Sequence, residues 1–360
     1  MADGTCIEWC HATVNAISGC MPVSPGCTNC YAMRAGSMNR PHHPATGLTQ
    51  PSKAGHVWTG AVRLNEAVLV KPLAWAKPRR IFWNAHGDPW HESVPFEWVD
   101  REMAIAALTP HHRHLFLTKR SARMRRYFAN THTPERILEA AKQLRALPAT
   151  WSWPLPNVWL GVSGEDLHHA EERIADLVKT PAAVRWLSGE PLLGPIQTLS
   201  PWFTGAELAD GKRVNGIDWV VVGGESGHGA RPMHPDWVRE IRDQCNAARI
   251  PFLFKQWGSW APISEMSDEQ IDRAYAPAPV RDPEGRRRCL VNQCVLHRNR
   301  ERFDGKAMFC RPAFEQRSGA MTMFEIGKRA AGRTLDRVIW DQYPELFPHE
   351  QLPRAAEAAA

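Results

Sequence analysis

The feature that most constrains the fold is an alternation of short apolar runs with stretches of helix-forming sequence. Each run is rich in β-branched or aromatic residues and ends in a polar or glycine-rich turn. Strands that are apolar on both faces and alternate with helices are typical of parallel β/α units. The expected strands are 80–84, 114–118, 158–162, 184–187, 219–223 and 251–255, with a seventh candidate at 56–59, and the expected helices are 95–109, 120–129, 134–146, 167–179 and 235–249.

Six or seven such units predict an α/β fold, a (β/α) barrel that is either full or partial. A doubly wound open sheet is the alternative. In a barrel of this kind the functional side chains lie in the loops that follow the strands.

Three cysteines in one N-terminal loop indicate the chemistry. Cys20, Cys27 and Cys30 follow the spacing C-x6-C-x2-C. Three thiolates can hold three irons of a [4Fe-4S] cluster and leave the fourth iron open to a substrate or cofactor. In the alternative, Cys27 and Cys30 are half of a structural zinc site that Cys6 and Cys10 complete.

Cysteine usage also bears on the compartment. The chain has 360 residues and nine cysteines, an odd number, and five of them fall in the first 30 residues. No secretory apolar segment precedes them, and no apolar run approaches the length of a membrane span. We therefore expect a cytoplasmic protein with no membrane association, in which cysteines ligate metal instead of forming disulfides.

We expect three regions along the chain. Residues 1–50 form an N-terminal cluster-binding loop region, and 51–262 form the barrel core. Residues 263–360 comprise a linker, a basic cysteine-containing insertion and a C-terminal segment that packs on the barrel. The Pro/Ala-rich stretch 274–280 is the expected linker, and the arginine-rich run 286–303 is the expected basic arm, a feature that suits nucleic-acid phosphates or is simply solvated.

Polar groups follow every expected strand, which predicts a shared polar pocket. Asp88, Lys119 and Lys255 are the candidate catalytic residues. His86 and His91 beside Asp88 suit proton transfer or a second metal. Four cations at these turns can clamp a phosphate or carboxylate, or else pair with Glu190, Glu225 and Asp88; they are Lys119, Arg120, Arg231 and Lys255.

Several motifs together resemble a phage-associated protein family of unknown function. That family carries a three-cysteine motif of this type and is itself similar to radical S-adenosylmethionine (SAM) enzymes. The resemblance spans about residues 7–336. Its motifs are Ile7-Glu-Trp9, Gly19-Cys20, Ser24-Pro-Gly-Cys-Thr-Asn-Cys-Tyr-Ala32, Phe116-Leu-Thr-Lys-Arg120, Trp159-Leu-Gly-Val-Ser163 with Glu165-Asp166, Gly189-Glu-Pro-Leu-Leu-Gly-Pro195, Val222-Gly-Gly-Glu-Ser-Gly227, Ala230-Arg-Pro-Met233, Phe254-Lys-Gln-Trp-Gly258, Gly327-Lys328 and Ala331-Gly-Arg333.

The resemblance implies a radical mechanism. Cys20, Cys27 and Cys30 would ligate a [4Fe-4S] cluster, and SAM would bind its open iron. One electron from a donor protein would cleave SAM to a 5′-deoxyadenosyl radical, which abstracts hydrogen from the substrate. The residues expected to contact SAM are Ser163, Glu190, Gly223, Gly224 and Glu225. The net charge of +6 permits a nucleic-acid or nucleotide substrate.

Two other functions fit the residues. The first is a zinc-bearing nucleic-acid-binding module without turnover. The second is a metal-dependent nuclease or repair enzyme with a structural cluster, in which clustered carboxylates hold Mg²⁺; those carboxylates would be Asp88, Glu165, Asp166, Glu190 and Glu225. Cys289, Cys294, His297 and Cys310 are either a second metal site or free side chains.

Overall fold

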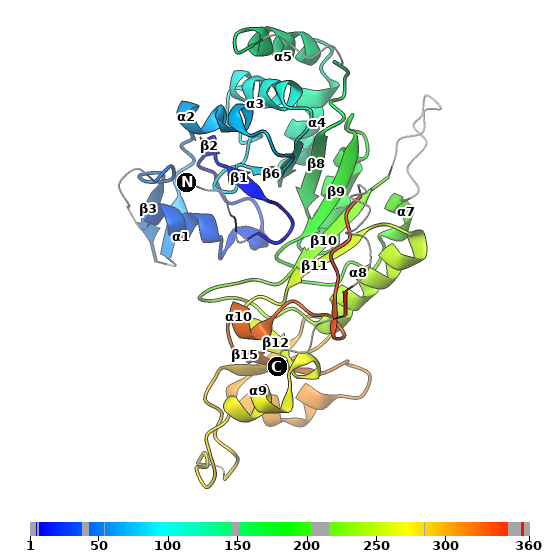
Figure 1. Cartoon of the computed structure of the whole chain (residues 1–360). Coiled ribbons are helices and arrows are strands. Elements are labelled where there is room, and N and C mark those ends of the chain that lie inside the picture. The colour runs from blue at the N-terminus through cyan, green and yellow to red at the C-terminus, as the bar shows by residue number, and fades with distance from the viewer. Residues whose placement is uncertain are drawn as a thin grey trace. The chain divides into compact units, whose positions relative to one another are not determined.

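A parallel sheet of seven strands organises the chain. The computed structural model describes residues 5, 7–37, 43–53, 55–145, 151–203, 216–283, 285–344 and 354–355. The strands follow the order β1-β6-β7-β8-β9-β10-β11 (Figure 1). Their bounds are Ala12–Val14 (β1), Arg80–Trp83 (β6), Arg113–Thr118 (β7), Val158–Ser163 (β8), Val184–Gly189 (β9), Trp219–Gly223 (β10) and Phe252–Gln256 (β11).

This order confirms a partial (β/α) barrel in coarse outline. The strands are neighbours in chain order, whereas the order of a doubly wound sheet reverses at a switch point. The sheet is curled, and the pairing of the described strands does not close it into a full barrel. All six residues of β8 are buried, as expected of a strand covered on both faces.

Six of the seven expected strands are confirmed, and the seventh was wrong. Residues 56–59 fall largely in β4 (Gly55–Trp58), which pairs with β3 (Thr49–Ser52) in a separate antiparallel hairpin. The place of the seventh strand is taken by β1, which pairs in parallel with β6. At three residues, β1 is too short to show a periodic apolar pattern.

The five expected helices are all present. They are α3 (Phe96–Leu108), α4 (Ser121–Ala129), α5 (Thr133–Lys142), α6 (Leu167–Leu177) and α8 (Pro235–Ala248). Figure 1 shows α3 and α5 side by side. The shorter elements are α1 (Tyr31–Ser37), α2 (Glu66–Leu69), α7 (Ser200–Phe203), α9 (Asp268–Arg273), α10 (Lys328–Ala331), β2 (Ile17–Ser18), β5 (Arg63–Leu64), β16 (Val338–Ile339) and β17 (Arg354–Ala355).

The chain divides into two compact units. The first comprises Met1–Gly164, His168–Ser188 and Pro201–Trp219, and the second comprises Glu165–Leu167, Gly189–Ser200 and Val220–Ala360. Tryptophans dominate the core of the first unit. Trp186 lies 5.2 Å from Trp9 and 5.3 Å from Trp219, centroid to centroid. A Cβ at Gly161 would lie 2.3 Å from the Trp186 ring, so glycine makes room for the indole.

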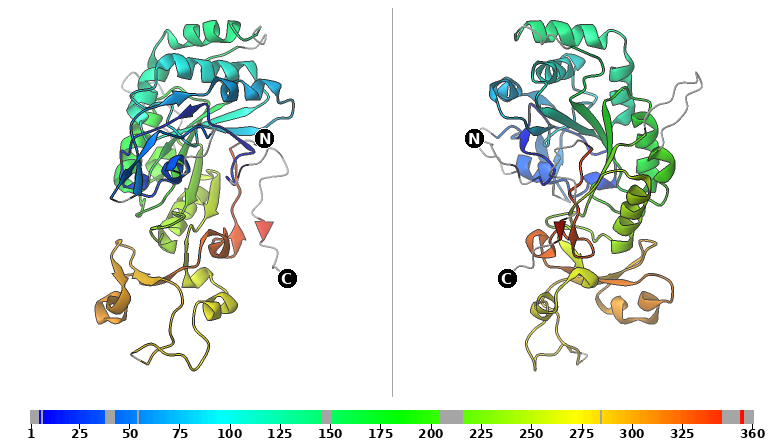
Figure 2. Two further views of the ribbon diagram at one scale, coloured as in Figure 1. Left: turned by 90° about the vertical axis from the view of Figure 1, so that its left-hand side faces the viewer. Right: turned by 45° about the vertical axis from the view of Figure 1, so that its right-hand side comes forward.

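The second unit contains a four-stranded antiparallel sheet in the order β12-β15-β13-β14 (Figure 2). Its strands are Trp260–Pro262 (β12), Gln293–Leu296 (β13), Arg302–Asp304 (β14) and Met321–Glu325 (β15). The basic run 286–303 therefore supplies two strands, and a basic appendage is not confirmed. The stretch expected as a linker pairs with the start of that run, since the Ala276 amide donates to the Arg288 carbonyl.

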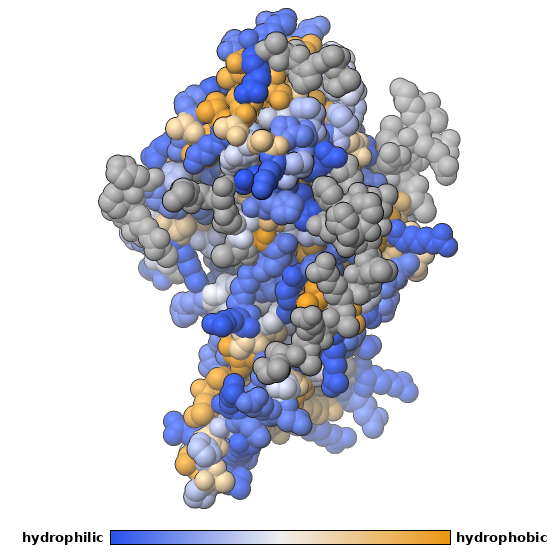
Figure 3. Space-filling model, viewed as in Figure 1, coloured by the Kyte–Doolittle hydropathy of each residue, from blue (hydrophilic) through white to orange (hydrophobic). Residues whose placement is uncertain are grey.

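None of the helices in the described ranges is long and apolar enough to cross a bilayer. On the face shown in Figure 3, hydrophilic residues (blue) predominate and hydrophobic ones (orange) form separate patches.

Candidate functional site

The loop that carries Cys20, Cys27 and Cys30 is fastened to the carboxyl end of β6. The Gly19 amide donates to the His86 carbonyl at 3.0 Å, and the Tyr31 hydroxyl donates to the Ala85 carbonyl at 2.7 Å. Gly19 has a φ of +100°, and a Cβ there would lie 2.1 Å from the Ala61 carbonyl oxygen. Only glycine fits this approach, so the entry to the loop is fixed by backbone geometry.

Arg120 joins that loop to two strand ends. Its guanidinium lies 3.1 Å from the Asp88 carboxylate, 3.5 Å from the Cys20 sulfur and 3.0 Å from the Met21 carbonyl. Asp88 also accepts from the Thr118 hydroxyl at 2.8 Å. Both charged side chains are more than nine-tenths buried. Asp88 therefore holds Arg120 against the cysteine loop, and its predicted catalytic role stays a prediction.

Burial and nearby charges set the state of the thiols. Burial and, to a lesser extent, the Asp88 carboxylate raise the pKa of Cys20 to about 12 against the opposing effect of Arg120. Burial also raises the pKa of Cys30, whereas Lys119 lowers it. Without a ligand these thiols are protonated at neutral pH. Arg120 and Lys119 are the cations placed to offset the charge of thiolates.

Lys119 differs from the other predicted cations. Within the part of the chain that the structure describes, its half-buried ammonium has no carboxylate partner within salt-bridge distance. Its backbone amide reaches Asp88 at 3.4 Å. A half-buried ammonium close to a thiol favours an anionic ligand at this point.

Among the described residues, no three His, Cys, Asp or Glu side chains lie close enough together to form a metal site. The Ser18 hydroxyl and His86 Nδ1, both beside the Gly19 turn, are buried without a hydrogen-bond partner among the described residues. Cys6, needed for the zinc alternative, lies outside the described residues. Three thiols in one loop beside two cations fit an iron–sulfur cluster in chemistry, once they turn toward one another.

His86 and His91, which were expected to form a proton-transfer group with Asp88, are not hydrogen-bonded to it through their rings in the described part of the chain. Burial and the neighbouring His43 lower the pKa of His86 to about 4, so its ring is neutral. Burial lowers the pKa of His91, whose Nδ1 accepts from the Ser93 amide.

In the second unit, Glu190 and Lys255 form an ion pair at the ends of β9 and β11. The Lys255 ammonium lies 3.1 Å from a Glu190 carboxylate oxygen, and the side chains are 18% and 14% exposed. A Cβ at Gly223 would lie 2.4 Å from that same carboxylate, so glycine leaves room for the Glu190 side chain in its present position. The structure thus brings together Glu190, Gly223 and Lys255, three residues predicted from separate motifs.

Glu225 is engaged by Arg231. The carboxylate accepts from the Arg231 guanidinium at 2.6 and 2.8 Å and from the Arg231 amide at 2.8 Å. A bidentate pair of this kind is strong and directional. Gly224 packs so closely on Trp257 that a Cβ would lie 1.9 Å from the Trp257 carbonyl oxygen. Glu225 and Gly224 therefore have clear structural roles.

The remaining candidates are dispersed. Ser163 ends β8, is buried, and its carbonyl accepts from Arg173 at 2.8 Å. Asp166 lies 3.9 Å from Arg300. Cys289 donates to two carbonyls at 3.3 Å, those of Ala274 and Val291, and is not part of a described metal group. Cys294 is buried in β13, His297 contacts the Ala313 carbonyl at 2.9 Å, and Cys310 is exposed.

Sequence reasoning missed Glu102. This acid is fully buried in α3, and Asn84 donates to both its oxygens at 2.8 and 3.1 Å. Asn84 in turn accepts from the Ile17 amide and has a φ of +58°. The available signal was position, because Glu102 falls on the same helical face as the buried residues Val99 and Ala106.

Comparisons with known proteins identify a family and no function. Searches among curated proteins and among solved structures find no match. The phage link and the likeness to radical SAM enzymes therefore stay predictions. One family model matches residues 4–344, nearly the whole chain, and the protein belongs to that family, which is described as protein of unknown function (DUF5131).

Proposed function

We propose that the protein is an iron–sulfur enzyme of the radical SAM type that modifies or repairs a nucleic-acid base or nucleotide. The observation that carries the proposal is the cysteine loop, fastened to the carboxyl end of β6 beside Arg120 and Lys119. Free thiols suit a reducing, cytoplasmic location.

The cysteines, the two neighbouring cations and Asp88 have different roles in this proposal. Cys20, Cys27 and Cys30 would hold a [4Fe-4S] cluster. A bound cluster would supply the one-electron chemistry that reductively cleaves the C–S bond of SAM and releases methionine, with a donor protein as the source of the electron. Arg120 and Lys119 offset the negative charge of the thiolates. Asp88 orients Arg120 through the 3.1 Å contact.

The Glu190–Lys255 pair suits an amino-acid ligand. A carboxylate and an ammonium side by side complement the amine and carboxylate of a zwitterion such as the methionine part of SAM. Both side chains are partly exposed, so they are accessible to a ligand. This supports the expected SAM role of Glu190 and favours a binding role for Lys255.

The hydrolytic alternative has less support. Asp88 and Glu225 each form a salt bridge with an arginine, Arg120 and Arg231 respectively. A carboxylate that already neutralises an arginine is a poor Mg²⁺ ligand, because the cation must first be displaced.

The test is anaerobic purification followed by iron, sulfide and zinc analysis. About four irons and four sulfides per chain, with release of 5′-deoxyadenosine on addition of dithionite and SAM, are expected. Cys20→Ala, Cys27→Ala and Cys30→Ala should each abolish both properties. Cys310→Ala, at an exposed position outside the loop, is the matched control and should retain them.

Two results would overturn the proposal. Zinc without iron in protein made with ample iron would favour the binding module. A cluster that never cleaves SAM would favour a structural role for the metal.

A further inference from the structure

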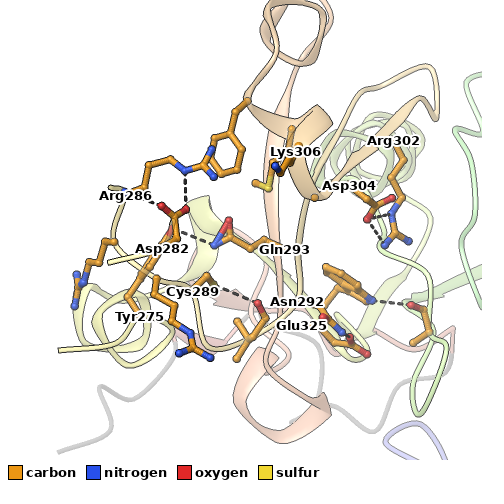
Figure 4. A pocket seen from close by; sticks show the side chains of 18 of the residues that line it. Tyr275, Asp282, Arg286, Cys289, Asn292, Gln293, Arg302, Asp304, Lys306 and Glu325 are labelled. Atoms are coloured by element: carbon orange, nitrogen blue, oxygen red, sulfur yellow. Dashed lines mark hydrogen bonds and ion pairs between the residues drawn. The ribbon is translucent and has the colours of Figure 1, made fainter. Parts of the chain in front are cut away.

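A pocket of about 940 Å³ opens in the second unit beside β13 and β14 (Figure 4). Most of its lining comes from Tyr275, Asp282 and the stretch 286–293, from β14 and from the 3₁₀ segment η4 (Gly305–Phe309), and the rest from residues 228–230, Trp260 and Glu325. The volume lies in the range of sites that enclose small molecules or nucleotides. None of the residues assigned above to the cluster or to SAM lines it.

The lining is positively charged. It carries five arginine or lysine side chains against three aspartates or glutamates, a difference of +2. Figure 4 shows two of these carboxylates beside arginines, Asp282 with Arg286 and Asp304 with Arg302, and each pair is 2.7 Å apart. The acids therefore hold the guanidinium groups in place, and the balance favours an anion.

Arg288 differs from Arg286 and Arg302, which are paired with carboxylates. It is exposed, and among the residues that the structure describes its side chain has no ion-pair partner. Its backbone is fixed, because the Arg288 carbonyl accepts from the Ala276 amide at 2.8 Å. A cation on a fixed backbone can reach a phosphate without breaking an existing pair.

Aromatic rings stand among these cations. Phe309 is 53% exposed, and the Arg286 guanidinium lies 3.8 Å from its centroid. Arg287 lies 5.1 Å from the centroid of half-buried Tyr275. An exposed ring backed by arginine is a stacking platform for a base. Gln293, whose amide donates to the Tyr275 hydroxyl at 3.2 Å, adds hydrogen-bonding capacity for a base edge.

We propose that this pocket binds single-stranded nucleic acid, with phosphates on the arginines and one unstacked base against Phe309. The inference deepens the proposed function, on which it rests for the idea that nucleic acid is the substrate. The binding itself requires neither cluster nor SAM. Duplex is disfavoured because its bases are stacked on one another and present no free face.

The test uses the full chain, purified in air without SAM. Fluorescence anisotropy would be measured with labelled mixed-sequence DNA and RNA of about a dozen nucleotides, within the known range of site sizes. The same DNA as a duplex, and polyglutamate as a competitor, complete the set. We expect single strands to bind at least about tenfold more tightly than duplex. Comparing the affinities for DNA and RNA shows whether deoxyribose or ribose is preferred.

Two variants localise the binding. Phe309→Ala should weaken it about fivefold or more, the usual effect of losing one base stack. Arg288→Gln should make the slope of log K against log salt less negative by about 0.7, the loss of one phosphate contact. Phe314→Ala and Arg311→Gln are matched controls, because both residues are exposed, lie in the following segment Arg311–Phe314 and do not line the pocket.

Absence of binding, equal affinity for duplex, or equal effects of the pocket and control variants would overturn the inference. Displacement by polyglutamate at matched charge would also do so, since it would indicate an acidic protein partner. These results are separate from the proposed function, because SAM cleavage is measured on the cluster-loaded protein without nucleic acid.

Discussion

Glu102 shows how one buried acid makes the stability of the protein depend on pH. Burial raises its pKa to about 8, although the Asn84 amide, which favours the charged form, opposes the shift. The unfolded value is about 4.3. Between these values the folded state keeps a proton that the unfolded state releases. The contribution of this group is therefore fully present below about pH 4 and is lost as the pH rises through about 8.

Glu102→Gln should remove this dependence. The free energy of unfolding of the wild type should fall relative to the variant by up to about 1.4 kcal/mol per pH unit between pH 5 and 8. Urea titrations at several pH values measure it. Glu97→Gln, at an exposed position of the same helix, is the control. Parallel pH profiles for wild type and Glu102→Gln would show that the acid is ionised when folded.

Arg120 links the cysteine loop to Asp88 through its contacts with Cys20 and Met21. Arg120→Gln leaves Asp88 buried without its cation, and breaking a buried pair costs about 3–5 kcal/mol. Thermal or urea unfolding should show this loss, and Asp88→Asn added to the same chain should recover part of it. Arg126→Gln, exposed on α4, should change little. A purely additive double variant would mean that the 3.1 Å contact contributes no coupling.

At the scale of elements, the turns after β10 and β11 are locked together by glycines. A Cβ at Gly224 meets the Trp257 carbonyl oxygen at 1.9 Å, and backbone cannot move aside as a side chain can. Gly224→Ala should therefore destabilise the second unit by about 2 kcal/mol or more. Gly189→Ala is the matched control, because its Cβ would find its nearest atom at 3.5 Å, an ordinary contact.

Buried parallel strands are the elements that the sequence pattern predicted best. Strands such as β8 and β10 were predicted because unbroken apolar runs are typical of buried parallel strands. The role of 286–303 was misjudged because its arginines dominate the composition. In the fold, Arg286 pairs with Asp282 and Arg302 pairs with Asp304. In the middle of the same run, β13 buries Cys294, Val295 and Leu296.

At the scale of the whole molecule, the two compact units predict a local response to the cluster. Loading with iron and sulfide should slow amide hydrogen exchange in residues 19–33, the loop that carries the thiols. Exchange in β12 to β15 should not change, because that sheet belongs to the other unit. Mass spectrometry of the loaded and cluster-free chains compares the two. Uniform protection along the chain would contradict this prediction.

The sequence by itself determined the β/α alternation, the three-cysteine loop and the strand ends on which the polar residues lie. These follow from local periodicity and spacing, which need no knowledge of distant contacts. The tertiary structure alone decided the partners. It paired Asp88 with Arg120, Glu190 with Lys255 and Glu225 with Arg231, and left Lys119 without a carboxylate partner among the described residues. The physical reason is that each carboxylate has several cations on neighbouring turns to choose from, near and far in the chain, and only folding selects which cation meets which carboxylate.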